Sequence, residues 1–145
     1  MRCALAVLLL MFLSTADAAP DRVGLARLQA DRISLDTKIN FAFDSDAIHR
    51  DSLAGIRDVA HLLKEHPEIV RIEVRGHTDS QGSSDYNLTL SQERADEVAR
   101  VLVQSGISPQ RVVSRGFGED RPLMRGDSER AHRTNRRVEF VITRR

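Results

Sequence analysis

The chain has 145 residues, a formal net charge of +1 at pH 7 and a single cysteine, Cys3. This length suits one domain that is large enough to bury its own core without disulfides. The near-neutral charge points to no particular partner. A single cysteine excludes a disulfide within the chain and a cluster of cysteine ligands around a metal.

The first 18 residues have the organisation of a secretory signal. An arginine gives a positive start, the apolar run at residues 4–13 is too short to span a bilayer, and Ala16 and Ala18 are small residues at the −3 and −1 positions. We therefore predict a signal peptide at residues 1–18 and an exported protein, with an uncleaved membrane anchor as the alternative. Cys3 comes too early to carry a lipid, so we do not expect a lipoprotein. No later stretch is apolar enough to be a transmembrane segment.

The first elements of the mature chain are a lead-in, a strand and a helix. Residues 19–35 form a short polar lead-in in which no clear period emerges. Apolar alternation over residues 39–43 predicts the first strand. A helix follows, with Asp51 or Ser52 as its N-cap and Pro67 at its end.

The middle of the chain predicts a second strand and a second helix. Residues 70–75 alternate between apolar and charged side chains, which is typical of a half-buried strand. Apolar residues then recur at helical spacing over residues 91–105. Ser91 is the expected N-cap of this helix, and Gly106 is its expected C′ residue.

Two more strands complete the predicted fold, at residues 112–117 and 138–142. The long charged connection between them, residues 118–136, is expected to lack regular structure. The order β-α-β-α-β-β implies right-handed crossovers between parallel strands. We therefore predict an α/β (α+β) two-layer sandwich, with two helices packed on one face of a mixed four-stranded sheet and water on the other face.

Two charged residues lie where the fold alone gives them little purpose. Asp79 falls in the loop after the second strand, and Arg94 falls at position N3 of the second helix, where the helix dipole disfavours a cation. Helix amides and a guanidinium bind carboxylates, and an aspartate binds an ammonium. The pair predicts a ligand that carries both groups, such as the head group of an amino acid. A plain surface salt bridge between Asp79 and Arg94 is the alternative.

The other residues give little support for catalysis or nucleic-acid binding. His61 and His66 are expected at the surface, and His77 is expected to pack against its loop rather than to bind a metal. The Gly-x-Ser-x-Gly nucleophile motif is absent from the sequence. Ten arginines against five acids between Arg111 and Arg145 indicate a solvated basic face, but one Tyr and no Trp make a poor stacking platform for nucleic acid. We expect no enzyme, no metal or other cofactor, and no nucleic acid as a partner.

A series of short motifs runs through the chain in a fixed order. They are Ile39-Asn40-Phe41-Ala42-Phe43-Asp44, Gly76-His77-Thr78-Asp79, Tyr86-Asn87, Leu90-Ser91, Arg94-Ala95, Gly116-Phe117-Gly118-Glu119 and Asn135-Arg136-Arg137-Val138-Glu139-Phe140. Through these motifs, residues 36–145 resemble the peptidoglycan-binding domain shared by OmpA-like proteins, Pal lipoproteins and the MotB flagellar stator.

The resemblance implies an OmpA-like domain that binds peptidoglycan without a covalent bond, through the meso-diaminopimelate of the stem peptide. The implied location is the Gram-negative periplasm, associated with the outer membrane or the cell wall. By the resemblance, Asp79 holds an ammonium of that residue and Arg94 holds its carboxylate. The other implied site residues are Thr78, Asn87 and Asp46, with Ser91, Asn135 and Arg137 in support. Asp46 replaces an asparagine that is frequent in the family and adds a second negative charge.

Two other functions stay open. The connection 118–136 and the basic C-terminal end form a surface that can dock other envelope proteins, either without wall binding or together with it. A metal-dependent wall hydrolase is the second alternative, but it needs a placed acid or a set of metal ligands, and the sequence has no such set at suitable spacing.

Overall fold

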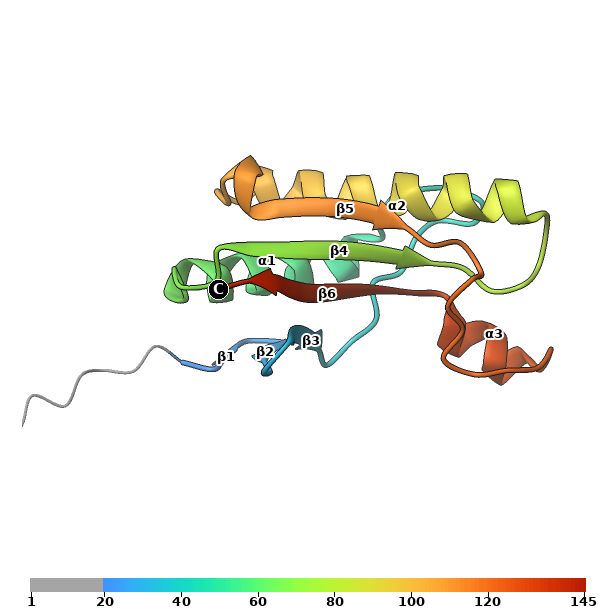
Figure 1. Ribbon diagram of the computed structural model, residues 1–145, viewed down its shortest axis with the longest axis horizontal. Coiled ribbons are helices and arrows are strands. Elements are labelled where there is room, and N and C mark those ends of the chain that lie inside the picture. The colour runs from blue at the N-terminus through green and yellow to red at the C-terminus, as the bar shows by residue number, and fades with distance from the viewer. Residues whose placement is uncertain (1–19) are drawn as a thin grey trace, which may run out of the picture.

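The computed structural model describes residues 20–145, and their backbone is organised around one six-stranded sheet in the order β1-β2-β3-β6-β4-β5 (Figure 1). The strands are β1 (Arg22–Val23), β2 (Ala26–Leu28), β3 (Arg32–Leu35), β4 (Arg71–His77), β5 (Val112–Gly116) and β6 (Arg137–Arg144). The helices are α1 (Arg50–Glu65), α2 (Ser84–Gln104) and α3 (Glu129–Asn135), with a 3-10 turn at Pro109–Arg111. The predicted signal peptide lies outside the described residues.

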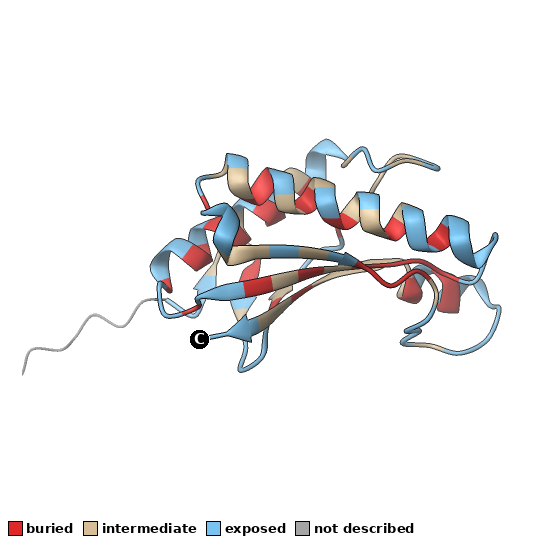
Figure 2. Cartoon of the chain, turned by 45° about the horizontal axis from the view of Figure 1, so that its top comes forward, coloured by how far each residue is buried: buried red, intermediate tan, exposed pale blue. Residues whose placement is uncertain are grey.

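The sheet is mixed. β6 lies between β3 and β4 and runs antiparallel to both, whereas β4 and β5 are parallel and are connected by α2. Both α1 and α2 cover the same face, and their buried residues are turned towards the strands (Figure 2). The predicted two-layer α/β sandwich is confirmed. The sheet has six strands rather than four, and a third helix, α3, lies at one end of it (Figure 1).

The core lies between these two helices and the sheet. Ile72 and Val74 of β4, Phe140 of β6, and Val98 and Leu102 of α2 belong to one cluster and are at most 2% exposed. Burying a side chain of this size stabilises the fold by about 1.5–3 kcal/mol. The alternate apolar residues therefore fix which face of the sheet turns towards the helices, and the charged residues between them are left on the open face.

The N-terminal strands lie in the segment that was predicted to be an irregular lead-in. β1, β2 and β3 form an antiparallel series, and β3 joins the sheet with Ile33 opposite Phe140 of β6. The strand predicted over residues 39–43 is wrong, because Phe41 makes only an isolated bridge to Ile48. Both edges of β6 are already occupied by β3 and β4, so residues 39–43 cannot pair with this strand.

The start of α2 also differs from the prediction. The hydroxyl of Ser83 accepts a hydrogen bond from the N–H of Tyr86 (3.3 Å), so the helix begins at Ser84, about two turns before the predicted cap. Ser91 therefore lies inside the helix and is fully buried. The end is as predicted, because Gly106 follows the helix with a φ of 97°.

Two further boundaries are corrected by the structure. The N-cap of α1 is His49, so neither Asp51 nor Ser52 caps this helix. The connection 118–136 contains α3, which starts where the hydroxyl of Ser128 accepts an N–H of the first turn (3.1 Å). None of the helices within residues 20–145 is long and apolar enough to cross a membrane.

Helix α2 approaches β4 and β5 so closely that two strand positions have room only for glycine. A Cβ at Gly76 would lie far inside the contact distance of the backbone oxygen of Ser91, and a Cβ at Gly116 would clash in the same way with the backbone of Gln92. These two glycines set the distance between the helix and the sheet at the point where the chain leaves β4 for the loop that contains Asp79.

We predict that Gly76→Ala lowers the free energy of unfolding by about 2 kcal/mol or more, because backbone meets backbone and cannot move aside cheaply. Gly55→Ala in α1 is the control, since its Cβ would lie 3.4 Å from a Leu35 methyl group. The control should stay within about 1 kcal/mol of the original protein, with a gain in helix propensity. Urea denaturation measures both. An equal effect of the two substitutions would contradict the close approach.

Candidate functional site

Asp79 is the buried acid of the site. It follows β4 directly and is 6% exposed. One carboxylate oxygen, Oδ1, accepts the backbone N–H of Gln81 (3.0 Å), and the other, Oδ2, accepts a guanidinium N–H of Arg136 (2.6 Å). The Arg136 side chain is 40% exposed, so the cation that balances Asp79 remains within reach of water. A ligand that carries an ammonium can take part in the same ion pair.

The role of Arg136 was not predicted from the sequence. Only Asn135 and Arg137 were expected to support the site, because an Asn-Arg-Arg triplet alone does not show which arginine reaches across to another loop. The structure resolves this, because Arg136 follows α3 directly and precedes β6, with its guanidinium directed at Asp79 and at Glu129 (3.4 Å).

Arg94 lies in the middle of α2 and not at its N-terminus. Its Nε donates a hydrogen bond to the backbone oxygen of Ser45 (3.0 Å), and its guanidinium lies 4.9 Å from the centre of the Phe41 ring. The expectation that helix N-terminal amides assist Arg94 is wrong, because those amides are near Ser83, about three turns away. The plain salt bridge between Asp79 and Arg94 is also absent from the described residues, as Asp79 pairs with Arg136 instead.

Burial is the main electrostatic influence on Arg94. It lowers the pKa of the Arg94 guanidinium, and repulsion from Arg136 acts in the same direction. Asp44, Asp79 and Asp46 act against this shift. Arg94 is thus a half-buried cation whose carboxylate neighbours are not in direct contact with it, which leaves its guanidinium able to accept an anionic ligand.

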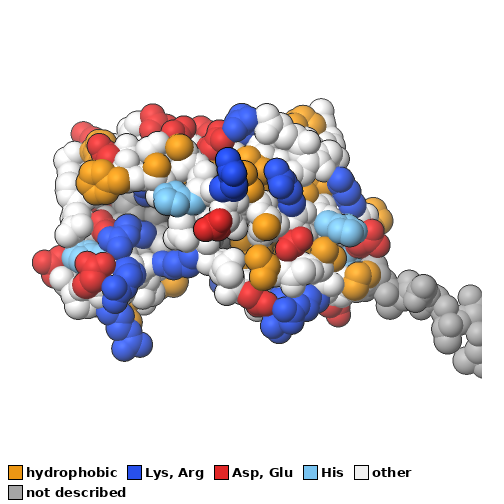
Figure 3. All heavy atoms as spheres, turned by 180° about the vertical axis from the view of Figure 1, so that it is seen from behind, with side chains coloured by type: hydrophobic (Ala, Val, Ile, Leu, Met, Phe, Trp, Pro, Cys, Tyr) orange, Lys and Arg blue, Asp and Glu red, His pale blue; other side chains and the backbone are white. Residues whose placement is uncertain are grey.

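A hollow of about 250 Å³ lies beside Arg94 and is strongly cationic. Its charged lining residues are Lys38, Arg94, Arg133, Arg136 and Arg137. Figure 3 shows several Lys and Arg side chains grouped near the end of the molecule that lies away from the N-terminal trace. Burial, followed by the positive charges of Arg136, Arg137 and Arg133, lowers the pKa of Lys38. This hollow favours carboxylates.

A second hollow, of about 220 Å³, lies next to Asp79 and is lined by two acids and one base, Arg125. Its lining includes Thr78, Asp79, Glu119 and Asn135. Asp79 lines this second hollow, while its partner Arg136 lines the cationic one. The ion pair between them therefore lies between the two hollows.

The remaining predicted residues mostly hold the loops of the site in place. The Asn87 amide donates to the backbone oxygen of Gln81 (3.0 Å) and to Glu119 (2.6 Å). Ser91 accepts the N–H of Gly118 (2.8 Å). Asp46 is exposed and touches the site only through its charge.

Two residues at the junction of α3 and β6 brace the segment before α3. Asn135 accepts the N–H groups of Leu123 (2.8 Å) and Met124 (3.0 Å), and Arg137 donates to the backbone oxygen of Arg121 (3.0 Å). Thr78 is tied through its backbone, which donates to Gly118 (2.9 Å). Its buried hydroxyl has no hydrogen-bond partner among residues 20–145, so it can still bond to a ligand.

The histidines do not form a metal site. His77 stacks on Phe117, as its predicted packing role requires, whereas His66 is buried and bonded to Glu68 (2.8 Å) rather than exposed. His132 is buried with Nδ1 3.8 Å from Asp79, and its Nε2 lies 3.0 Å from Asp127. In the part of the chain that the structure describes, no three His, Cys, Asp or Glu residues are placed to hold one ion.

Comparison with known proteins identifies the family. The model of the OmpA family matches residues 40–136, which is more than half of the chain. The chain belongs to the OmpA family. This match covers the loop of Asp79, the whole of α2 and the turn that carries Arg136.

Two curated relatives are similar in sequence to this OmpA-family chain. It is 40% identical over 114 residues to outer membrane porin F of Pseudomonas fluorescens, covering 79% of this chain and 34% of that protein. It is also 40% identical over 101 residues to a peptidoglycan-associated lipoprotein of Legionella pneumophila, covering 70% of this chain and 57% of the relative. The chain therefore spans between a third and three fifths of the length of these two curated relatives.

Solved structures of related proteins share the fold. The peptidoglycan-associated lipoprotein of Burkholderia pseudomallei superposes with a TM-score of 0.65 at 33% identity, covering 72% of this chain and 89% of that structure. The periplasmic domain of Helicobacter pylori MotB superposes with a TM-score of 0.66 at 27% identity, covering 80% and 78%. Both similarities extend over most of the described sheet and helices.

The strand that leads away from the site contains a strongly acidic carboxyl group. The His77 imidazole, 3.7 Å away, and the Arg137 guanidinium, at 2.7 Å, lower the pKa of Glu139 from 4.5 to about 2. Because the folded-state pKa is depressed, Glu139 stabilises the fold fully above about pH 4.5, and this contribution is lost as the pH falls towards 2.

We predict that Glu139→Gln lowers the free energy of unfolding by roughly 2 kcal/mol at pH 7, and that the difference closes as the pH falls from 4.5 to 2. Glu93→Gln, on the exposed side of α2, is the control and should show little change at any pH. Urea denaturation across this pH range measures both. A difference for Glu139→Gln that stays constant with pH would show that the carboxylate charge is not responsible.

Proposed function

We propose that this OmpA-family domain binds bacterial cell-wall peptidoglycan non-covalently through the meso-diaminopimelate residue of the stem peptide. The observation that carries the proposal is the buried Asp79, which is paired with Arg136 between an acidic hollow and a cationic one. The side-chain end of diaminopimelate in a stem peptide carries an ammonium and a carboxylate on one carbon. The two hollows match these two charges.

Each charged residue has a distinct role in this proposal. Asp79 accepts the ligand's ammonium, and Arg94 binds its carboxylate with a two-pronged guanidinium contact. Lys38, Arg133 and Arg136 add positive potential, which attracts the carboxylate to the cavity. Thr78 offers its buried hydroxyl as a further hydrogen-bond group next to Asp79. These are binding contacts, and we propose no chemical step on the ligand.

The relatives give independent support. One of them is a lipoprotein of Legionella pneumophila that is described as peptidoglycan-associated, and another is an outer membrane porin. We propose the same setting for this chain, namely the periplasm of a Gram-negative envelope. We also propose that residues 1–18 direct export, and that the wall-binding domain occupies residues 36–145 after a short segment at 19–35.

The ion pair between Asp79 and Arg136 makes the choice of variant important. Removing the whole carboxylate side chain would leave Arg136 without its partner and would also remove the acceptor of the Gln81 N–H bond. Asp79→Asn keeps the shape of the side chain and its bond from Gln81 while it removes the charge. Arg94 makes no ion pair among the described residues, so Arg94→Ala removes a ligand contact with less effect on the fold.

We predict that the protein co-sediments with purified diaminopimelate-type peptidoglycan, and that Asp79→Asn and Arg94→Ala each reduce the bound fraction at least about tenfold, since each loses a charged contact. Arg57→Ala is the control, because Arg57 is exposed on α1 and lines neither of the two hollows, and its removal changes the net charge as Arg94→Ala does. Circular dichroism checks that each variant is folded. Folded variants that sediment as well as the original protein would disprove the assignment of the site.

A further inference from the structure

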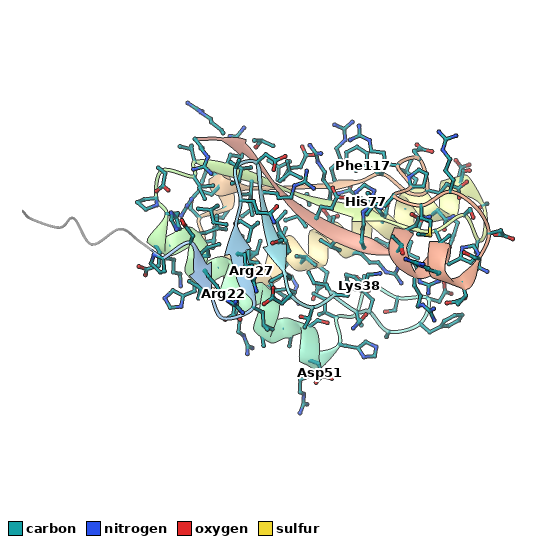
Figure 4. All side chains as sticks on the ribbon, turned by 90° about the horizontal axis from the view of Figure 1, so that it is seen from below. Arg22, Arg27, Lys38, Asp51, His77 and Phe117 are labelled. Carbon is teal, nitrogen blue, oxygen red and sulfur yellow. The ribbon has the colours of Figure 1, made fainter. Side chains whose placement is uncertain are left out.

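The open face of the sheet carries a second group of charges around the stack of His77 and Phe117, in which His77 also lines the cationic hollow. The register of β4 and β5 places Arg75 beside Arg115, and His77 and Phe117 follow at the ends of the same strands. The two rings stack with their centres 5.4 Å apart and their planes 11° from parallel. Figure 4 shows them side by side. α1 and α2 both lie on the opposite face (Figure 1).

Three arginines surround this stack. The guanidinium carbons of Arg75, Arg115 and Arg121 lie 5.6, 5.0 and 3.9 Å from the centre of the Phe117 ring. Phe117 itself is buried, whereas Arg115 and Arg121 are exposed. We call the three arginines, Arg75, Arg115 and Arg121, the Phe117 arginine cluster. The face of an aromatic ring attracts cations, which explains how one side chain holds three guanidinium groups close together.

The positive charge of two of the three arginines, Arg115 and Arg121, is not balanced by an acid of residues 20–145. Arg75 is paired with Glu73 (2.5 Å), and Glu139 is paired with Arg137. Within residues 20–145, Arg115 and Arg121 have neither an ion pair nor a side-chain hydrogen bond to any acid. The guanidinium groups of Arg115 and Arg121 lie near the same ring and repel each other. An incoming anion is therefore attracted to both of them at once.

The edge of the sheet next to the cluster is closed to an added strand. Gln92 of α2 accepts the outward N–H of Gly116 (2.8 Å) and donates to the outward oxygen of Ser114 (3.5 Å). These are the backbone groups that an extended peptide would use to join β5. A partner must therefore lie on the open face, over the side chains, and not along the strand edge.

The surroundings of the cluster favour a protein over a surface of phosphates. Glu73 and Glu139 lie in the same face and would repel a uniformly anionic membrane or nucleic acid. Val113 points to this face opposite Glu73 and is 41% exposed. Arginines around an aromatic ring with an apolar neighbour are typical of the central residues of protein interfaces.

We propose that the Phe117 arginine cluster is a docking surface for an acidic segment of a partner protein, whose carboxylates pair with Arg115 and Arg121 while an apolar neighbour covers Val113. This surface goes beyond the proposed wall binding and does not use Asp79 or Arg94. The two activities can therefore fail separately.

Fluorescence anisotropy with a labelled oligoglutamate peptide tests the proposal at low ionic strength. We expect Arg115→Gln/Arg121→Gln to weaken binding roughly five- to tenfold, since each exposed ion pair contributes up to a few-fold. The matched control is Arg50→Gln/Arg57→Gln, which removes the same charge from exposed positions of α1 and should change binding less than twofold. Peptidoglycan sedimentation of the Arg115→Gln/Arg121→Gln variant should be unchanged.

Three outcomes would overturn the proposal, and a fourth would overturn only the proposed wall binding. If the original protein did not bind the peptide, the cluster would not be a docking surface. If both double variants lost the same amount of peptide binding, the binding would depend on overall surface charge and not on the cluster. Phosphatidylglycerol vesicles or a single-stranded DNA oligomer that bind more tightly than the peptide, through the same two arginines, would replace the acidic protein with a phosphate surface. If sedimentation failed while peptide binding stayed dependent on the cluster, the proposed wall binding alone would be wrong.

Discussion

The carboxylate of Asp79 lies at the end of the central strand β4 with almost no access to water, so its charge has to be balanced nearby. The protein balances it with Arg136, which comes from a segment 57 residues further along the chain. This pair joins the loop after β4 to the turn between α3 and β6. The two hollows, one acidic and one cationic, exist because these segments are held together at that point.

Close packing positions this pair. Gly76 and Gly116 let the backbone of α2 approach β4 and β5, and Ser91 bonds to the backbone of Gly118 from inside that helix. Arg94 projects from the following turn of the same helix. The distance between α2 and the sheet therefore sets the position of the Arg94 guanidinium relative to the loop of Asp79. The site depends on a rigid contact between a helix and a sheet, although Asp79 and Arg136 come from the segments that connect these elements.

The sequence predicted the parts of the fold that rest on a strong local pattern. The alternation of Ile72 and Val74 marked β4, and the helical repeat with Gly106 marked the body and end of α2. Short strands gave no such signal: β1, β2 and β3 have two to four residues each and are stabilised by pairing with β6, which no local pattern reveals.

The site was predicted in its chemistry and only in part in its geometry. Asp79 and Arg94 were identified from charges in unexpected places, and family resemblance pointed to the same two residues. The reason given for Arg94 was wrong, because two serines eight positions apart, Ser83 and Ser91, are equally good caps and only the packing of the first turns distinguishes them. The role of Arg136 depends on its contact with Asp79, which lies 57 positions earlier in the chain. Neither periodicity nor spacing in the sequence predicts such a contact.

The most direct test of the central claim is an NMR titration of the ¹⁵N-labelled protein with free meso-diaminopimelate. Pimelate has the same carbon chain without ammonium groups, and cadaverine has the ammonium groups without carboxylates, so both serve as matched controls. We expect diaminopimelate to shift the Nε–H signal of Arg94 and the backbone N–H of Gln81, which is bonded to Asp79, and both controls to bind more weakly. Signals that stay unmoved, or that move equally with all three compounds, would contradict a site that recognises the two charges together.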